Sequence, residues 1–180
     1  ASNDYGLRIH KGMGLKSSHG TILLQQTGRK TTKIHQTAPT YWEASEGISI
    51  GSPVTIDGRG RVVIDTDRQA DGKGEFVLEP TSNITVISDD LEQVHITAAD
   101  IRWECHLEAR NTPIVIQTSP SSGSLMQLGL TGDGHGLHIS DAEFDRVHTT
   151  STITLGGNET EQIKFDGITE LVIAQRQTAW

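Results

Sequence analysis

Three groups of carboxylates come closest to a catalytic arrangement in this chain. They are Asp65, Asp67 and Asp71; Asp89, Asp90 and Glu92; and Asp141, Glu143 and Asp145. Two carboxyls on one face can act as acid and base in glycoside hydrolysis, and Asp65 and Asp67 share a face if the chain is extended there. No Asp-rich signature with a partnering Arg or His at close spacing accompanies them. We therefore expect a solvated acidic face and no enzymatic activity.

Histidine is the next candidate, because the chain has eight of them. His135 and His138 are three residues apart, which in a strand directs them to opposite faces. The chain contains no Cys-x-x-Cys or His-Glu-x-x-His spacing for zinc, no Gly-x-Ser-x-Gly elbow and no phosphate-cradling loop. We expect solvated histidines, no metal site and no cofactor.

An aromatic pair, Tyr41 and Trp42, is the strongest candidate for binding. It follows Pro39 in a stretch that reads as a protruding loop, and Glu43 and Glu46 lie beside it. Aromatic rings next to acids on a loop could stack on a sugar ring or on a partner protein. The alternative is that Tyr41 and Trp42 cap or cover part of the core.

Short strands must position all of these residues, because apolar residues alternate with polar ones along most of the chain. The stretches with this pattern are 6–9, 21–24, 47–50, 54–56, 62–64, 76–78, 84–86, 94–96, 114–116, 137–139, 153–155, 163–165 and 171–173. Helical periodicity is confined to 140–147, where Ser140 and Glu143 fit a capping box for one or two turns.

The corner Asp-Gly-x-Gly occurs three times, at 57–60, 71–74 and 133–136, each time before a strand pattern. Asp accepts a hydrogen bond from the backbone two residues on, and Gly adopts positive φ without strain. Calcium-binding β-rolls also use Gly- and Asp-rich turns, but in tandem. The scattered positions favour turns over calcium sites.

Composition excludes several classes of partner. The net charge of -8 disfavours nucleic acid and anionic membranes, and no apolar run is long enough to span a bilayer. The first residues do not read as a signal segment. The lone Cys105 shares its strand parity with Trp103 and Leu107, so we expect a buried, inert thiol.

A repeat emerges when Gly6 to Leu24 is aligned with Gly47 to Ile64, in about two units of 20 residues each. Such units predict an all-β fold, a right-handed parallel β-helix (β-solenoid), with residues 1–180 forming a single domain. The ends of such a stack are unpaired edges. We therefore expect either a piece of a longer rod or a subunit that assembles end to end.

The stretch from 128 to 168 resembles a unit of haemagglutinin-like exoproteins, including the filamentous-haemagglutinin-like passengers of two-partner secretion. The residues that carry the resemblance are Gly136-Leu137-His138-Ile139, Ala142-Glu143-Phe144-Asp145-Arg146 and Thr152-Ile153-Thr154-Leu155-Gly156. It is a match to repeat pattern rather than to a catalytic signature. The resemblance implies a right-handed parallel β-helix, export to the cell surface or the medium, and an adhesive or structural role.

These observations together predict a secreted or cell-surface module that presents its outer faces and loops to a protein receptor, a glycan or a neighbouring subunit. Two other classes stay open. One is a β-helical carbohydrate-active enzyme, either a polysaccharide lyase or a hydrolase. The other is a self-assembling fibre subunit.

Overall fold

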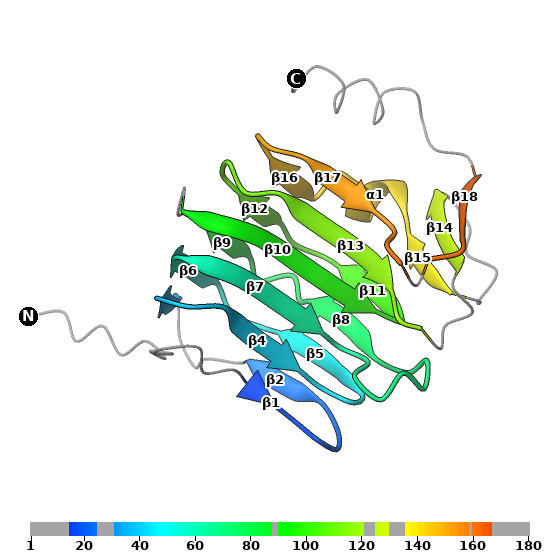
Figure 1. Ribbon diagram of the computed structural model, residues 1–180, viewed down its shortest axis with the longest axis horizontal. Helices are drawn as coiled ribbons and strands as arrows, with labels where there is room; N and C mark the ends of the chain where they lie inside the picture. Colours follow the sequence, from blue (N-terminus) through cyan, green and yellow to red (C-terminus); the bar gives the residue numbers. More distant parts are fainter. Residues whose placement is uncertain are drawn as a thin grey trace, which may run out of the picture.

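A computed structural model of the chain describes residues 15–24, 31–87, 90–120, 125–129, 136–158 and 160–166. Strands dominate these residues (Figure 1). They are β1 (Leu15–Lys16), β2 (Ile22–Leu24), β3 (Thr32–Gln36), β4 (Thr40–Glu43), β5 (Gly47–Ile50), β6 (Val54–Gly58), β7 (Gly60–Asp65), β8 (Glu75–Leu78), β9 (Ile84–Val86), β10 (Leu91–Ala98), β11 (Asp100–Trp103), β12 (Leu107–Ala109), β13 (Ile114–Thr118), β14 (Leu125–Gly129), β15 (Leu137–Ile139), β16 (Val147–Thr149), β17 (Ile153–Leu155) and β18 (Gln162–Asp166), with one helix, α1 (Asp141–Phe144).

The strands form parallel sheets that the chain visits in rotation. Sheet A has the order β1-β4-β7-β10-β13-β17, sheet B β11-β8-β5-β2, sheet C β16-β12-β9-β6-β3 and sheet D β15-β14-β18. Up to β13, each strand therefore pairs with the strand three places before or after it in the chain. The predicted all-β class is confirmed, and the parallel order is compatible with the predicted β-helix.

The core follows from this register, because each inward apolar side chain lies next to another inward apolar side chain on the neighbouring strand. In sheet A, Trp42 pairs with Ile64, Ile64 with Ile96 and Ile96 with Ile116. All four are fully buried. The inward rows of the four sheets contribute to one apolar cluster, where Trp103 packs edge-on against Phe76 at 5.9 Å between ring centroids. Burial of these rows is the main driving force for the stack.

The strand predictions are confirmed wherever the structure describes the residues concerned. Two of the predicted strands, 6–9 and 171–173, lie outside the described residues. The predicted repeat alignment is wrong in register. Ile22 pairs with Ile48 and not with Val62 or its neighbours, because the segments between paired strands differ in length. Leu15 likewise pairs with Trp42 and not with Ile56.

The first Asp-Gly-x-Gly corner joins β6 to β7 through two glycines of positive φ, Gly58 and Gly60. A Cβ on Gly58 would lie 1.8 Å from the carbonyl oxygen of Gln36, so only glycine fits. In the second corner, the backbone N–H of Lys73 donates to Asp71 Oδ1 at 3.2 Å, which confirms the predicted turn. The third corner lies largely outside the described residues.

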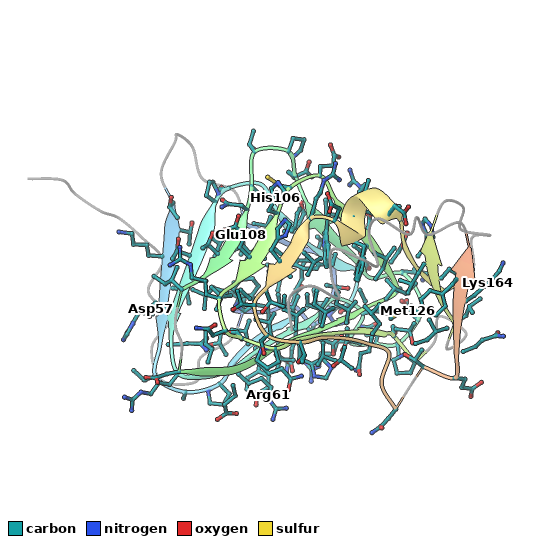
Figure 2. All side chains as sticks on the ribbon, turned by 90° about the horizontal axis from the view of Figure 1, so that it is seen from above. Asp57, Arg61, His106, Glu108, Met126 and Lys164 are labelled. Carbon is teal, nitrogen blue, oxygen red and sulfur yellow. The ribbon has the colours of Figure 1, made fainter. Side chains whose placement is uncertain are left out.

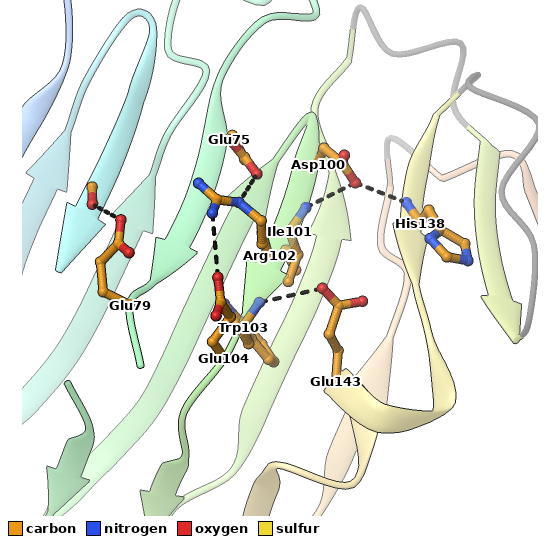
Figure 3. A network of polar contacts seen from close by, with 10 residues as sticks. Glu75, Glu79, Asp100, Ile101, Arg102, Trp103, Glu104, His138 and Glu143 are labelled. Atoms are coloured by element: carbon orange, nitrogen blue, oxygen red, sulfur yellow. Dashed lines mark hydrogen bonds and ion pairs between the residues drawn. The ribbon is translucent and has the colours of Figure 1, made fainter. Parts of the chain in front are cut away.

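Sheets B and D meet at a seam between β11 and β15, which Figure 3 shows from close by. Side chains bridge it: Asp100 Oδ1 accepts from the backbone N–H of His138 at 3.4 Å, and Glu143 Oε1 accepts from that of Trp103 at 3.2 Å. Glu143 also completes the capping box with Ser140 that the sequence predicts at α1. One carboxylate therefore both caps the helix and closes the seam.

Within the described residues, no helix has the length and apolar character needed to cross a membrane.

Candidate functional site

The outer face of sheet A carries two rows of polar side chains that interact across its strands, and these strands lie side by side in the foreground of Figure 1. Inward residues alternate with outward ones along each strand. The parallel register therefore lines the outward side chains up across the sheet. One row, here called the polar row, consists of Lys16, Glu43, Asp65, Thr97 and Gln117. The other, called the mixed row, consists of Tyr41, Val63, His95, Val115 and Thr154.

Glu43 is the charge centre of the polar row. Its Oε2 lies 3.1 Å from Lys16 Nζ and 3.4 Å from Arg68 Nη1. Asp65 is its register partner on the next strand. Two cations and two carboxylates thus meet at one end of the sheet.

Asp65 is the residue whose acidity the fold changes most clearly. Its side chain is half-buried, and this partial burial raises its pKa to about 6. A hydrogen bond from the backbone N–H of Asp67 opposes the rise, while the charges of Glu43 and Asp67 add to it. Asp65 therefore exchanges a proton near neutral pH, as a general acid does.

Asp67 contradicts the expected solvated acidic face, because it is 1% exposed. Its carboxylate accepts from the Ser119 hydroxyl at 2.5 Å and from the backbone N–H groups of Gly72 and Asp71 at 2.9 and 3.2 Å. The strand ends at Asp65, so Asp67 turns inward and pins the loop before β8. Asp65 and Asp67 therefore do not form an outward pair.

The structure separates the two predicted binding residues, Tyr41 and Trp42. The expected protruding loop is wrong, because both residues belong to strand β4. Trp42 is fully buried and contributes to the core, which leaves its ring no accessible face for a ligand. Tyr41 is 42% exposed and stands in the mixed row, two residues from Glu43 and on the same face. Binding by Tyr41 stays a prediction.

In the middle of the face, neutral side chains of the two rows make hydrogen bonds, and Arg61 is the nearby charge. Gln117 Nε2 donates to Thr97 Oγ1 at 3.0 Å, and Gln93 Nε2 lies 3.5 Å from His95 Nδ1. Partial burial lowers the pKa of His95, although a hydrogen bond to Gln117 opposes this and the charge of Arg61 adds to it. His95 therefore tends to the neutral form, and this part of the face offers amide, hydroxyl and imidazole groups.

The other carboxylates and the cysteine that the sequence analysis singled out lie away from the outer face of sheet A. Exposed Asp90 pairs with Arg59 at 3.2 Å, and Glu143 belongs to the seam. Cys105 lies in a bend between β11 and β12 and is half-buried, so the expected buried strand position is wrong. In the parts of the chain that the structure describes, no three His, Cys, Asp or Glu side chains gather around a possible metal ion.

Sequence reasoning missed Lys16 and Arg68, the two cations that meet at Glu43. Lys16 lies on the two-residue strand β1, too short for a period to be visible. Arg68 follows β7 in the loop to β8. Only the register of β1 against β4 brings Lys16 beside Glu43.

Comparison of the chain with protein-family models, with curated proteins and with solved structures gave no match.

Proposed function

We propose that the chain is a right-handed parallel β-helix that serves as a structural or adhesive module of the haemagglutinin-like exoprotein type, secreted or held at the cell surface. The observation that carries this proposal is the parallel pairing, up to β13, of each strand with the strand three places before or after it in the chain. Such a stack presents its outward side chains as fixed rows. The repeat pattern of 128–168 supports the same assignment.

The outer face of sheet A offers groups that suit a glycan. Tyr41 presents an exposed ring for the C–H face of a pyranose, and the carboxyls of Glu43 and Asp65 beside it can hydrogen-bond sugar hydroxyls. Further along, Thr97 and Gln117 continue the same row with neutral groups. Because the strands hold these groups in place, little side-chain freedom is lost on binding.

Binding to immobilised glycans tests the proposal. Tyr41→Ala should weaken retention by about two- to twelvefold, since stacking on an aromatic ring supplies on the order of 0.5–1.5 kcal/mol. Leu23→Ala is the matched control, because Leu23 is a 56% exposed apolar residue on sheet B. Equal loss in both variants, or no glycan retained by the wild-type chain, would contradict the assignment.

A second candidate, a carbohydrate-active enzyme, is favoured by one observation. Asp65, with its pKa raised to about 6, stands beside Glu43 on the neighbouring strand. Adjacent strands are about 4.8 Å apart, close to the ~5–5.5 Å between the two carboxyls of retaining glycosidases. The test is the release of reducing ends from acidic and neutral polysaccharides. Cleavage that Asp65→Asn abolishes would replace the adhesive assignment, whereas no cleavage by the wild-type chain would leave it in place.

Self-assembly is the third candidate, and strand β18 at the edge of sheet D favours it. Ile163 and Phe165 are 37% and 65% exposed, although their register partners Met126 and Leu128 are buried. Among the described strands, β18 pairs with β14 alone, and a sheet edge that carries apolar side chains invites a second copy. Light scattering over a hundredfold concentration range should reveal growth into filaments, and a monomer throughout would exclude this candidate.

A further inference from the structure

Two histidines that are distant in sequence meet on the outer face of sheet C. His106 directly precedes β12, and His148 lies on β16. His106 Nδ1 is 3.2 Å from His148 Nε2, and the rings stack with centroids 5.3 Å apart and planes inclined by 29°. Both side chains are exposed.

The parallel register explains why the two rings meet. Leu107 pairs with Val147, and both point into the core. Their neighbours therefore point outward, which places Glu108 directly opposite His148. His106 lies two residues before Glu108 and on the same face. Figure 2 shows His106 and Glu108 on the side of the molecule opposite Arg61, which belongs to β7 of sheet A.

A hydrogen bond between the two facing nitrogens requires that one of them carries a proton and the other does not. A neutral imidazole donates through one nitrogen and accepts through the other. If the donating ring moves its proton to its outer nitrogen, both facing nitrogens present lone pairs with no net loss of a proton. A tautomer shift of one ring is therefore enough to turn two hydrogen-bonded nitrogens into two nitrogens that can each bind a metal ion.

The separation of the facing nitrogens suits a single metal ion. A metal at ~2.05 Å from each of two nitrogens 3.2 Å apart subtends an angle of about 103°. This value is close to the tetrahedral angle that zinc prefers. Stacked strands hold both backbones in place, so the two rings only have to turn about their side-chain bonds for both lone pairs to meet at one ion.

We propose that His106 and His148 form a binding site for a divalent transition-metal ion with a preference for nitrogen ligands, such as Cu(II) or Zn(II). The carboxylate of Glu108 adds negative charge beside the site, and the net charge of -8 favours cations in general. Water fills the other coordination positions. The site is independent of the glycan face on sheet A.

The test uses the full chain with CuSO₄ and ZnCl₂. Calorimetry should give tighter binding of Cu(II) than of Zn(II), following the usual order of affinities, and none of Mg(II). Electron paramagnetic resonance should report two nitrogen ligands on Cu(II). His106→Ala and His148→Ala should each weaken binding by at least about tenfold and reduce the nitrogen count.

His35→Ala is the matched control, because His35 is exposed on the same sheet but faces Asp57, with Nδ1 3.4 Å from Oδ2. A Cys105→Ser variant excludes the neighbouring thiol as the ligand. Neither change should affect the affinity. His106→Gln and His148→Gln, checked for fold by circular dichroism, provide a second pair of variants. If the folded variants at His106, or those at His148, bind Cu(II) as tightly as the wild-type chain, the proposal is wrong.

Discussion

Asp65 and Glu43 occupy register-paired positions on the neighbouring strands β7 and β4, and both side chains belong to the polar row on the outer face of sheet A. The half-burial of Asp65 raises the pKa of its carboxyl to about 6, and the charge of Glu43 adds to the rise. Asp65 is therefore largely protonated in mildly acidic solution.

This relationship predicts how stability depends on pH. The pKa of Asp65 rises from 3.8 to about 6 on folding, so the folded chain binds the proton more tightly than the unfolded chain. Stability should fall as pH rises from about 4 to about 6. The shift corresponds to about 3 kcal/mol, which partial exposure reduces to about 1–2 kcal/mol.

Asp65→Asn removes this ionisation. The variant should be more stable than the wild-type chain by about 1–2 kcal/mol above pH 7. Near pH 4 the difference should vanish. Urea unfolding at both pH values measures it, and Asp71→Asn serves as the control, because Lys73 holds the pKa of that exposed carboxyl below its usual range. A constant difference at both pH values would show that Asp65 does not carry the effect.

Trp42 predicts a contrast between two substitutions. Trp42→Ala should destabilise the chain by about 3–5 kcal/mol, since it empties a fully buried position. Trp42→Phe should cost less than about 1.5 kcal/mol. The reason is that the buried indole N–H has no hydrogen-bond partner among the described residues, and Phe removes this unmet donor.

Thermal unfolding of both Trp42 variants separates the loss of core packing from the loss of the indole N–H. If Trp42→Phe cost as much as Trp42→Ala, the indole N–H would have to make a bond that stabilises the fold.

Two glycines with positive φ should respond differently to alanine. Gly58→Ala places a methyl group 1.8 Å from the carbonyl oxygen of Gln36, while nothing lies within 4 Å of a Cβ on Gly20. Gly20→Ala should cost about 1–2 kcal/mol, the strain of the left-handed backbone alone. Gly58→Ala should cost at least about 3 kcal/mol, because β3 and β6 must also separate. Chemical denaturation of the two variants measures the difference, and equal costs would show that the contact at Gly58 relaxes freely.

Glu143 predicts the strength of the seam between sheets B and D. Glu143→Ala removes the partner of the Trp103 N–H and one half of the capping box, so we expect a loss of about 2–3 kcal/mol. Hydrogen exchange at Trp103 should accelerate as well. Glu104→Ala is the control, because Glu104 makes an exposed ion pair with Arg102 at 3.4 Å, worth less than about 1 kcal/mol. Unchanged exchange at Trp103 would mean that Glu143 does not close the seam.

The sequence predicts the fold class well because alternation is a local property. Short strands such as Val54–Gly58 and Ile114–Thr118 are readable from their own residues. The register is not readable, because segments of unequal length join the paired strands. Trp42 shows the consequence: its neighbours Pro39 and Tyr41 predict a loop, while pairing with Leu15 and Ile64 makes it a core residue.

The candidate site depends on register even more than the fold does. Asp65 could be singled out from its spacing, but its partner Glu43 and the cation Lys16 come from other strands. The stacked pair of His106 and His148 is likewise invisible in the sequence, since only the alignment of β12 with β16 brings the rings together.

The position of β14 has a consequence for how the protein is made. Most strands dock on one that the ribosome has already delivered, so the stack can grow as the chain emerges. Among the described strands, β14 pairs with β15 and β18, both of which are synthesised after it. It can therefore begin to pair only once β15 has left the exit tunnel, and its second neighbour, β18, is added last of all the described strands.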